Sequence, residues 1–179
     1  MATLGSVELF FAWLAGTAAI ALLPSLARDP KRERRFYCKA IRRPAWAPRE
    51  TLVFSVVWTV LYVLQALAAT RIRLLGAWLS GVNLGALVVY VVLQVALASY
   101  TFFFFGLQSL WASTLSTFAA LVLALIETVF AFRLDTLSGI IFVALDVWLL
   151  YAFVLSATIL YLTNGAKMTR RATRSQVVC

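Results

Sequence analysis

Histidine is absent from the 179 residues of this sequence, and cysteine occurs only twice, at Cys38 and Cys179. The lack of histidine removes the commonest metal ligand and general base, and with it histidine ligation of a haem iron. Two distant cysteines provide neither a disulfide framework nor the spacing of a metal site. The sequence also lacks a phosphate-binding loop and a nucleophile elbow, so a common hydrolase or kinase is disfavoured. We therefore expect no metal and no obligatory cofactor.

Charged residues are scarce, at 13% of the chain, and most of them lie in two short blocks. Hydrophobic residues make up 63% of the chain, and the mean hydropathy is +0.93. Soluble domains contain roughly 45–50% apolar residues. Because a chain this apolar cannot bury its surface in a single water-soluble core, the sequence predicts a multi-pass membrane protein embedded in a lipid bilayer.

Five apolar segments are long enough to cross a bilayer, which takes about 20 residues. They are residues 4–27, 51–70, 78–105, 111–132 and 139–163. Residues 28–50 form the long polar loop, and the other connections are short, which favours antiparallel neighbours in a compact bundle. We predict an all-α fold: one five-helix membrane domain over residues 1–169, followed by a basic tail at 170–179.

Lysine and arginine are distributed unevenly between the two predicted membrane faces. The face of the first loop, the third loop and the tail carries 13 of them, and the opposite face carries Arg71, Arg73 and Arg133. The positive-inside rule then places the N-terminus outside and the C-terminus in the cytosol. This asymmetry explains the net charge of +9, and no nucleic-acid partner is expected.

One face of the second predicted span is aromatic. Phe54, Trp58, Tyr62 and Gln65 follow one another at helical spacing, so they share a face. Such a face could line a pocket for a flat or sterol-like ligand, where stacking and one hydrogen bond fix the orientation. It could equally pack against neighbouring helices, and periodicity alone favours packing.

Three acidic residues lie in or beside the predicted spans. Asp135 immediately precedes the fifth span, where a carboxylate favourably caps a helix N-terminus. Glu127 and Asp146 lie deeper, and intramembrane carboxylates are functional-site hypotheses by default. Arg133 is close enough along the helix to reach towards Glu127. No second carboxylate is spaced to form an acid–base pair with either residue.

Two short motifs suggest contacts outside a pocket. Gly81 and Gly85 are four residues apart, a spacing that lets membrane helices approach closely and that predicts a dimer face or packing within the chain. Leu155, Tyr161 and Lys167 fit a loose sterol motif. Apolar helices with a basic end match that motif often, and the alternative is an interfacial tyrosine beside a lysine whose charge reaches the headgroups.

The stretch RRPAWAPRETLVFSVVWTVLY sets Pro44, Trp46 and Pro48 in front of an aromatic helix, and the stretch from Leu134 to Leu155 begins with Leu-Asp and contains Trp148. Both resemble signatures of the translocator protein family, also known as the TspO or peripheral benzodiazepine receptor family. The stretch RRPAWAPRETLVFSVVWTVLY, residues 42–62, is similar to the family's loop and second helix. The matching positions in and before it are Phe36, Tyr37, Arg43, Pro44, Trp46, Pro48, Phe54, Trp58, Leu61 and Tyr62. A second stretch resembles the fifth helix of the family through Leu134, Asp135, Gly139, Trp148, Ala152 and Leu155.

The chain also departs from the family pattern, and it is identified as a divergent member. Arg49 and Glu50 stand where a second loop proline is usual, and Tyr100 lies near a third-helix tryptophan position. In the fifth span, Ala144-Leu145 replaces Pro-Tyr and Ser156 replaces an asparagine.

The resemblance implies a pocket inside the five-helix bundle, beneath the first loop, that binds porphyrins such as protoporphyrin IX, haem or a sterol. By motif, the expected ligand-binding residues are Trp46, Phe54, Trp58, Tyr62, Gln65, Tyr100, Trp148, Ala152 and Ser156. The implied role is transport, storage or signalling. One alternative is an enzyme that degrades porphyrin in light through Trp58 and Trp148. Another is a membrane scaffold with a degenerate pocket. The Gly81–Gly85 spacing makes a homodimer the expected assembly, and in a eukaryote the resemblance implies the mitochondrial outer membrane.

Overall fold

The computed structural model describes residues 5–24, 36, 41–48, 51–75 and 81–176. This part of the chain contains five α-helices and a short π-helical turn. The helices are α1 (Ser6–Leu22), α3 (Thr51–Leu75), α4 (Gly81–Thr101), α5 (Leu110–Leu134) and α6 (Thr136–Gln176), and the turn is η3 (Phe102–Gly106). The prediction of an all-α fold is confirmed.

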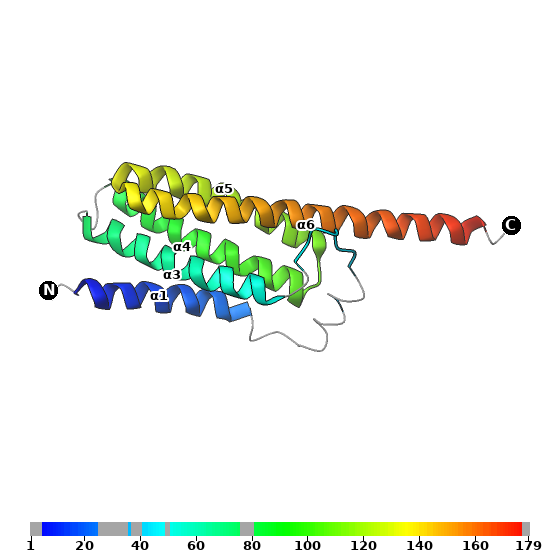
Figure 1. Cartoon of the computed structure of the whole chain (residues 1–179), viewed down its shortest axis with the longest axis horizontal. Coiled ribbons are helices and arrows are strands. Elements are labelled where there is room, and N and C mark those ends of the chain that lie inside the picture. Colours follow the sequence, from blue (N-terminus) through cyan, green and yellow to red (C-terminus); the bar gives the residue numbers. More distant parts are fainter. Residues whose placement is uncertain (1–4, 25–35, 37–40, 49–50, 76–80, 177–179) are drawn as a thin grey trace.

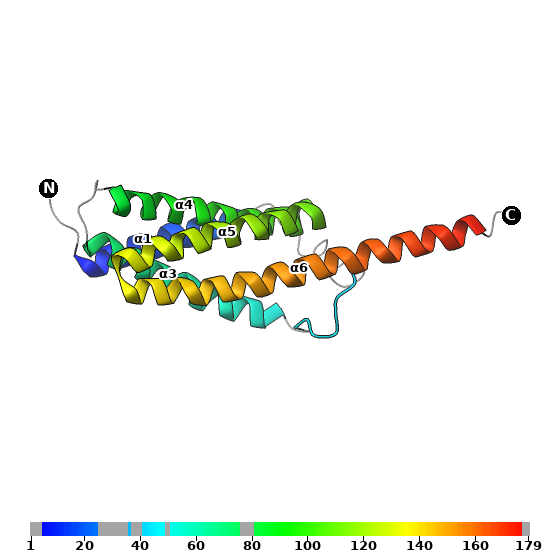
Figure 2. The same cartoon turned by 90° about the horizontal axis from the view of Figure 1, so that it is seen from above.

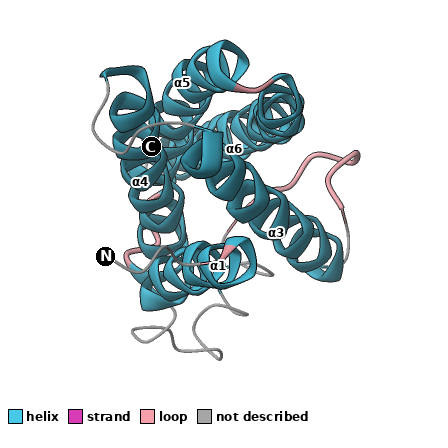
Figure 3. Ribbon diagram, turned by 90° about the vertical axis from the view of Figure 1, so that its left-hand side faces the viewer, coloured by secondary structure: helices cyan, strands magenta, loops and turns pink. Residues whose placement is uncertain are grey.

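The helices form a bundle in which α3, α4, α5 and α6 alternate in direction and α1 packs against α3 and α4 (Figures 1 and 2). The view along the bundle shows α1 beside α3 and α4, while α5 and α6 lie together on the other side (Figure 3). The largest interface joins α5 and α6. Consecutive helices therefore pack as antiparallel neighbours, as the short connections predict.

Four of the helices are long and apolar enough to span a membrane within the described residues: Val53–Leu75, Gly81–Gly106, Leu110–Leu134 and Thr136–Asn164. The fifth, α1, is apolar but has only 17 residues. At 1.5 Å per residue it is about 25 Å long, shorter than the hydrocarbon core of about 30 Å. Residues 25–27 of the predicted first span lie outside the described residues. The last helix exceeds its prediction, because α6 continues to Gln176.

The outside of the bundle is apolar, as expected of a surface in contact with lipid. Large hydrophobic side chains are exposed along every helix of the bundle, including Phe11, Val56, Val88, Leu125 and Val147. The interior contains many alanines, among them Ala68, Ala86, Ala120, Ala124 and Ala131, each at most 1% exposed. Small side chains let membrane helices approach closely, so the alanines bring the helices together around a few large buried residues such as Leu93 and Phe142.

The connection between α5 and α6 is a single residue, Asp135, in an extended conformation. We call this end of the bundle the turn end. Gly139 follows on α6, where an added Cβ would lie only 2.4 Å from Cδ1 of Phe132. A residue with a side chain does not fit there without displacing the ring, so this glycine permits the tight approach of the two helices.

At the opposite end, which we call the tail end, three distant parts of the chain meet. The backbone N–H of Arg42 donates to Oγ1 of Thr163 on α6 at 3.1 Å. The turn between η3 and α5 lies at the same end (Figure 1). The sequence-based topology requires the first loop, the third loop and the tail to share one face of the bundle, and the described parts of these segments do so.

Candidate ligand-binding pocket

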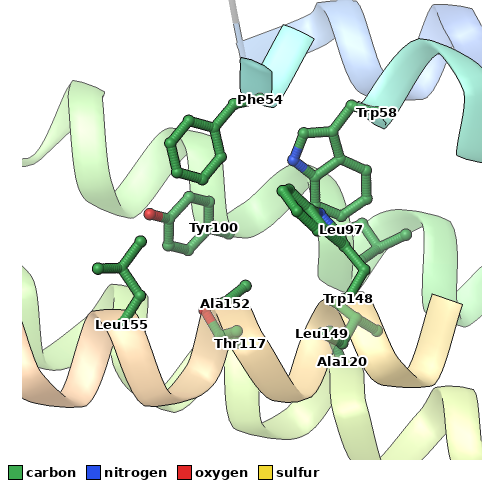
Figure 4. A pocket seen from close by; sticks show the side chains of 10 residues that line it. All are labelled: Phe54, Trp58, Leu97, Tyr100, Thr117, Ala120, Trp148, Leu149, Ala152 and Leu155. Atoms are coloured by element: carbon green, nitrogen blue, oxygen red, sulfur yellow. The ribbon is translucent and has the colours of Figure 1, made fainter. Parts of the chain in front are cut away.

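A pocket lies between α3, α4, α5 and α6 in the half of the bundle nearer the tail end (Figure 4). Its lining consists of Phe54, Trp58, Leu97, Tyr100, Thr117, Ala120, Trp148, Leu149, Ala152 and Leu155. Four of these side chains are aromatic, and charged groups are absent from this lining. Such a surface suits a flat, largely apolar ligand.

Tryptophan and phenylalanine from two helices meet in this pocket. Phe54 and Trp58 are one turn apart on α3, so both project from the same face. The ring centroid of Trp148, on α6, lies 5.8 Å from that of Phe54 and 6.3 Å from that of Trp58, both edge-to-face. These are distances at which aromatic rings attract one another. The predicted aromatic face of the second span therefore both lines the pocket and packs against α6.

The wall opposite these rings comes from α4 and α5, and it contains several residues that sequence reasoning missed. Tyr100 was expected there, but Leu97, Thr117 and Ala120 were not. The Thr117 hydroxyl donates to the backbone carbonyl of Ser113 at 2.9 Å, as threonine commonly does within a helix. These residue types are ordinary for membrane helices, so only the tertiary packing identifies them. Leu149 was missed for the same reason.

Three expected pocket residues lie near this lining without being part of it. Tyr62 stacks on Trp58, with ring centroids 5.5 Å apart. Gln65 is completely buried, and its Oε1 accepts a 2.7 Å hydrogen bond from Nε2 of Gln94 on α4. Ser156 is 5% exposed. Tyr62 thus supports a lining residue, whereas Gln65 links two helices.

Trp46, the expected lid residue, lies in the short segment that precedes α3. Trp46 is 50% exposed, and its ring makes an edge-to-face contact with Tyr151, at 5.8 Å between centroids. Tyr151 in turn contacts Trp148 at 5.3 Å. Trp46 is therefore connected to the pocket through one intervening ring. Most of the predicted lid loop, including Arg49 and Glu50, lies outside the described residues.

The pocket is narrow in this conformation. The space that water-sized molecules can enter is about 50 Å³, enough for a few waters but well below the roughly 300–1,000 Å³ of typical ligand sites. A large flat ligand must therefore separate the rings of α3 and α6.

The indole nitrogen of Trp148 gives the pocket a defined polar group. Nε1 of Trp148 is buried and has no hydrogen-bond partner among the described residues. An indole N–H can only donate, and a buried donor without a partner carries a free-energy cost. A ligand with an oxygen acceptor at this position would remove that cost.

The two intramembrane carboxyl groups have different surroundings. Glu127 is 1% exposed, and neither carboxyl oxygen has a hydrogen-bond partner in the described structure. The approach to Arg133 that its spacing allows is therefore not made. Asp146 is 9% exposed, and its Oδ2 accepts from the Thr128 hydroxyl at 2.7 Å. Neither residue belongs to the pocket lining.

Asp135 caps α6, as predicted, and also forms an ion pair that the sequence analysis did not anticipate. Its Oδ2 accepts from the backbone N–H and the hydroxyl of Ser138 at 2.9 and 2.7 Å. Nε and Nη2 of Arg71, on α3, donate to the two carboxyl oxygens at 2.8 and 2.9 Å. The Arg71 guanidinium, followed by the Ser138 donors, holds the pKa of Asp135 well below its usual range. The network joins α3 to the α5–α6 hairpin.

The small-residue and sterol motifs are divided between the inside and the outside of the bundle. A Cβ on Gly85 would contact Phe130 of the same chain at 3.5 Å, whereas Gly81 has nothing within 4 Å. Leu155 is 8% exposed and lines the pocket, whereas Tyr161 is 78% exposed. The side chain of Lys167 lies outside the described structure. Leu155 and Tyr161 thus face different surroundings.

Comparison with known sequences gives consistent matches. Residues 10–162 match the profile of the TspO/MBR family. The chain is 31% identical over 130 residues to "Protein CrtK" of Rhodobacter capsulatus, covering 72% of this chain and 79% of that protein. It is also 31% identical over 142 residues to "Tryptophan-rich sensory protein" of Cereibacter sphaeroides, covering 78% and 82%. The matched residues include the pocket lining.

Proposed function

Because the chain belongs to the TspO/MBR family of membrane proteins, we propose that it binds a flat polycyclic ligand, a tetrapyrrole or a sterol, in the aromatic pocket. The observation that carries this proposal is the position of Phe54 and Trp58 opposite Trp148, with edge-to-face ring contacts. A tetrapyrrole is the better fit of the two, because its large π-surface can stack on several of these rings. The bound ligand is then transported, stored or sensed, and the name of the sensory relative supports sensing.

A titration with protoporphyrin IX tests this function. The detergent-purified chain is titrated while the absorbance of the porphyrin is recorded, so that changing a tryptophan does not alter the signal itself. Loss of one aromatic contact costs about 0.5–1.5 kcal/mol, so Trp58→Leu should weaken binding by roughly two- to tenfold. Trp111→Leu is the matched control, because Trp111 is 70% exposed and lies outside the pocket lining. Equal affinities of the two variants, or no saturable binding by the parent, would exclude this pocket.

A second function, light-dependent degradation of protoporphyrin, is supported by one further feature. Two tryptophans, Trp58 and Trp148, line the same pocket, and a light-excited porphyrin that has separated their rings takes one electron from an indole, so that the indole is oxidised and the porphyrin is reduced and loses its absorbance. Illumination of the bound complex should then bleach the porphyrin in the parent protein and more slowly in Trp58→Phe and Trp148→Phe. A bound pigment that bleaches no faster than free pigment leaves binding as the function.

The membrane orientation is part of the same proposal. We place the tail end on the cytosolic side, because 13 of the 16 lysines and arginines belong to the first loop and the tail, and cytosolic segments carry the excess of such residues. A cysteine-accessibility experiment with a reagent that does not cross membranes, using Arg42→Cys in a Cys38→Ser, Cys179→Ser background, tests it. We expect the cysteine to be labelled only after the cells are permeabilised. Labelling of intact cells would show that the orientation is the reverse of the one proposed.

A further inference from the structure

A second cavity, separate from the aromatic pocket, opens at the tail end of the bundle. The space that water-sized molecules can enter there is about 250 Å³, compared with about 50 Å³ for the aromatic pocket. Phe36 and Ile41 form one side of this tail-end cleft, the first residues of α5 form another, and the last part of the α6 span forms the third. The two cavities have no lining residue in common, so this cleft needs its own explanation.

Hydrogen bonds fix the cleft on both sides. On one side, Gln108 adopts the left-handed conformation, with φ of 54°, which is uncommon for a residue other than glycine. The flanking N–H groups of Leu107 and Ser109 donate to η3 at 3.0 and 2.9 Å, and the Ser109 hydroxyl caps α5. On the other side, the backbone N–H of Arg42 donates to Thr163. The cleft is therefore built into the fold.

The lining divides into an apolar wall and a polar edge. The wall includes Phe36, Ile41 and Leu160, and it continues into a buried cluster around Phe104 and Ile159.

The edge carries the side-chain amides of Gln108 and Asn164. Amides both donate and accept hydrogen bonds, and neither is charged. The cleft thus offers an amphiphile an apolar wall beside neutral hydrogen-bonding groups, an arrangement that matches an acyl chain joined to an ester.

The cleft lies where the membrane surface is expected. Two apolar spans meet there, since one begins at Leu110 and the other ends at Asn164. Trp111 lines the cleft and is 70% exposed, and Tyr161 on α6 is 78% exposed. Exposed tryptophan and tyrosine at the ends of spans mark the headgroup level of a bilayer. A lipid is therefore the molecule that surrounds the opening of the cleft.

The charge beside the cleft selects the class of lipid. Arg42 is exposed, follows the lining residue Ile41, and is attached through its backbone to the lining residue Thr163. More generally, the segments at this end of the molecule carry most of its cations. Basic residues beside a membrane span attract anionic headgroups.

We propose that the tail-end cleft is a binding site for one anionic phospholipid. An acyl chain lies along Ile41 and Leu160, the ester region meets the amides of Gln108 and Asn164, and the phosphate lies beside Arg42. The proposal does not depend on what the aromatic pocket binds, so the two can fail separately.

Native mass spectrometry of the delipidated full-length protein tests the site. Dioleoylphosphatidylglycerol and dioleoylphosphatidylcholine have the same acyl chains and differ in headgroup charge. We expect one phosphatidylglycerol per chain to be retained preferentially, by about fivefold over phosphatidylcholine if a single arginine supplies the difference. Equal retention of the two lipids, or retention of neither, would overturn the proposal.

Two pairs of variants test whether the lipid binds in the cleft. Arg42→Gln should abolish the preference for phosphatidylglycerol, whereas Arg133→Gln, a change of another exposed arginine at the turn end, should preserve it. Leu160→Trp fills the cleft and should lower the retention of both lipids, whereas Leu150→Trp, at a site 54% exposed on α6, should not.

Circular dichroism and thermal unfolding report whether each variant is folded. If Leu160→Trp is not folded, the arginine pair still decides the question, because both of those changes are at the surface. Unchanged lipid preference in Arg42→Gln contradicts the proposal.

Discussion

Asp135 and Glu127 lie eight residues apart on the α5–α6 hairpin, Asp135 at the turn end and Glu127 about two helical turns away, towards the middle of the bundle. At the turn end, the carboxylate of Asp135 receives hydrogen bonds from Arg71 and from the backbone and side chain of Ser138. In the middle, the carboxyl group of Glu127 receives none from the described residues. A carboxylate is stabilised where donors surround it, whereas a buried carboxyl group without donors carries a free-energy cost.

This difference assigns separate roles to the two regions. The turn end is a structural junction in which each carboxyl oxygen of Asp135 has a donor and the helices are in tight contact. The middle of the bundle retains unpaired polar groups, and unpaired polar groups lower stability. Natural proteins keep such costs mainly where function requires them. Four predictions follow from the comparison, in order of decreasing expected effect.

Removal of the carboxylate at the turn end should have the largest effect. Asp135→Ala loses the helix cap, which alone contributes about 0.5–2 kcal/mol, and also leaves Arg71 without its ion-pair partner. Asp135→Asn is the matched control, since asparagine caps a helix about as well as aspartate. Thermal unfolding in detergent should show that the parent is the most stable, Asp135→Asn is less stable and Asp135→Ala is the least stable. Equal melting temperatures for all three would show that the junction contributes nothing.

The tight helix contact at the turn end can be tested through its glycine. Gly139→Ala places a Cβ against the ring of Phe132, and overpacking of this kind costs about 1–3 kcal/mol. Gly81→Ala is the control, because nothing lies within 4 Å of its Cβ position. A lower melting temperature is expected for Gly139→Ala only. A stabilised Gly139→Ala would mean that Phe132 moves aside freely.

In the middle of the bundle, we expect a substitution to increase the stability of the protein instead of decreasing it. Glu127→Leu removes a buried carboxyl group that has no partner and should raise the free energy of unfolding by about 1–3 kcal/mol. Glu127→Gln, which keeps a polar group of the same size, should change it less. The measurement is again unfolding in detergent. Destabilisation by Glu127→Leu would instead show that the carboxyl group is hydrogen-bonded in the membrane.

The pH dependence of stability should be the smallest effect and should come from Asp135. Its pKa is lower in the folded protein than the ordinary value of about 3.9, so the unfolded chain binds the proton first as the pH falls. The stabilisation is thus fully present above about pH 4 and is lost progressively in stronger acid. The difference in melting temperature between the parent and Asp135→Asn should be constant from pH 8 to 5 and shrink below about pH 4. A difference that grows in acid would contradict the assigned pKa direction.

The sequence could predict the fold because long apolar runs report which segments cross a bilayer. They do not report how long each helix is, since hydropathy ends at the membrane surface while backbone hydrogen bonding can continue. For this reason α6 extends through Gln176 although its predicted span ends at residue 163. The helix cap at Asp135 could also be predicted, because it depends on local sequence alone.

The candidate site could be predicted only in part. The aromatic face of α3 and Trp148 were recognisable from their spacing and from the family resemblance. Leu97 and Ala120 were not, because their role depends on which neighbours they meet. Gln65 illustrates the same limit: its spacing placed it on the aromatic face, whereas the hydrogen bond it accepts from Gln94 of α4 depends on tertiary packing. The tail-end cleft had no sequence signal, since its lining comes from several distant segments.

The one-residue connection at Asp135 also constrains how the protein is assembled in the membrane. With so short a link, α5 and α6 cross the bilayer as one hairpin, and in the proposed orientation their shared tip takes Arg133 and Asp135 across the hydrocarbon layer. The opposite charges of these two residues make that passage less costly than either charge alone. Arg71 can reach Asp135 only after α3 has also crossed. Formation of the Arg71–Asp135 pair therefore requires α3 and the α5–α6 hairpin to be inserted and packed side by side.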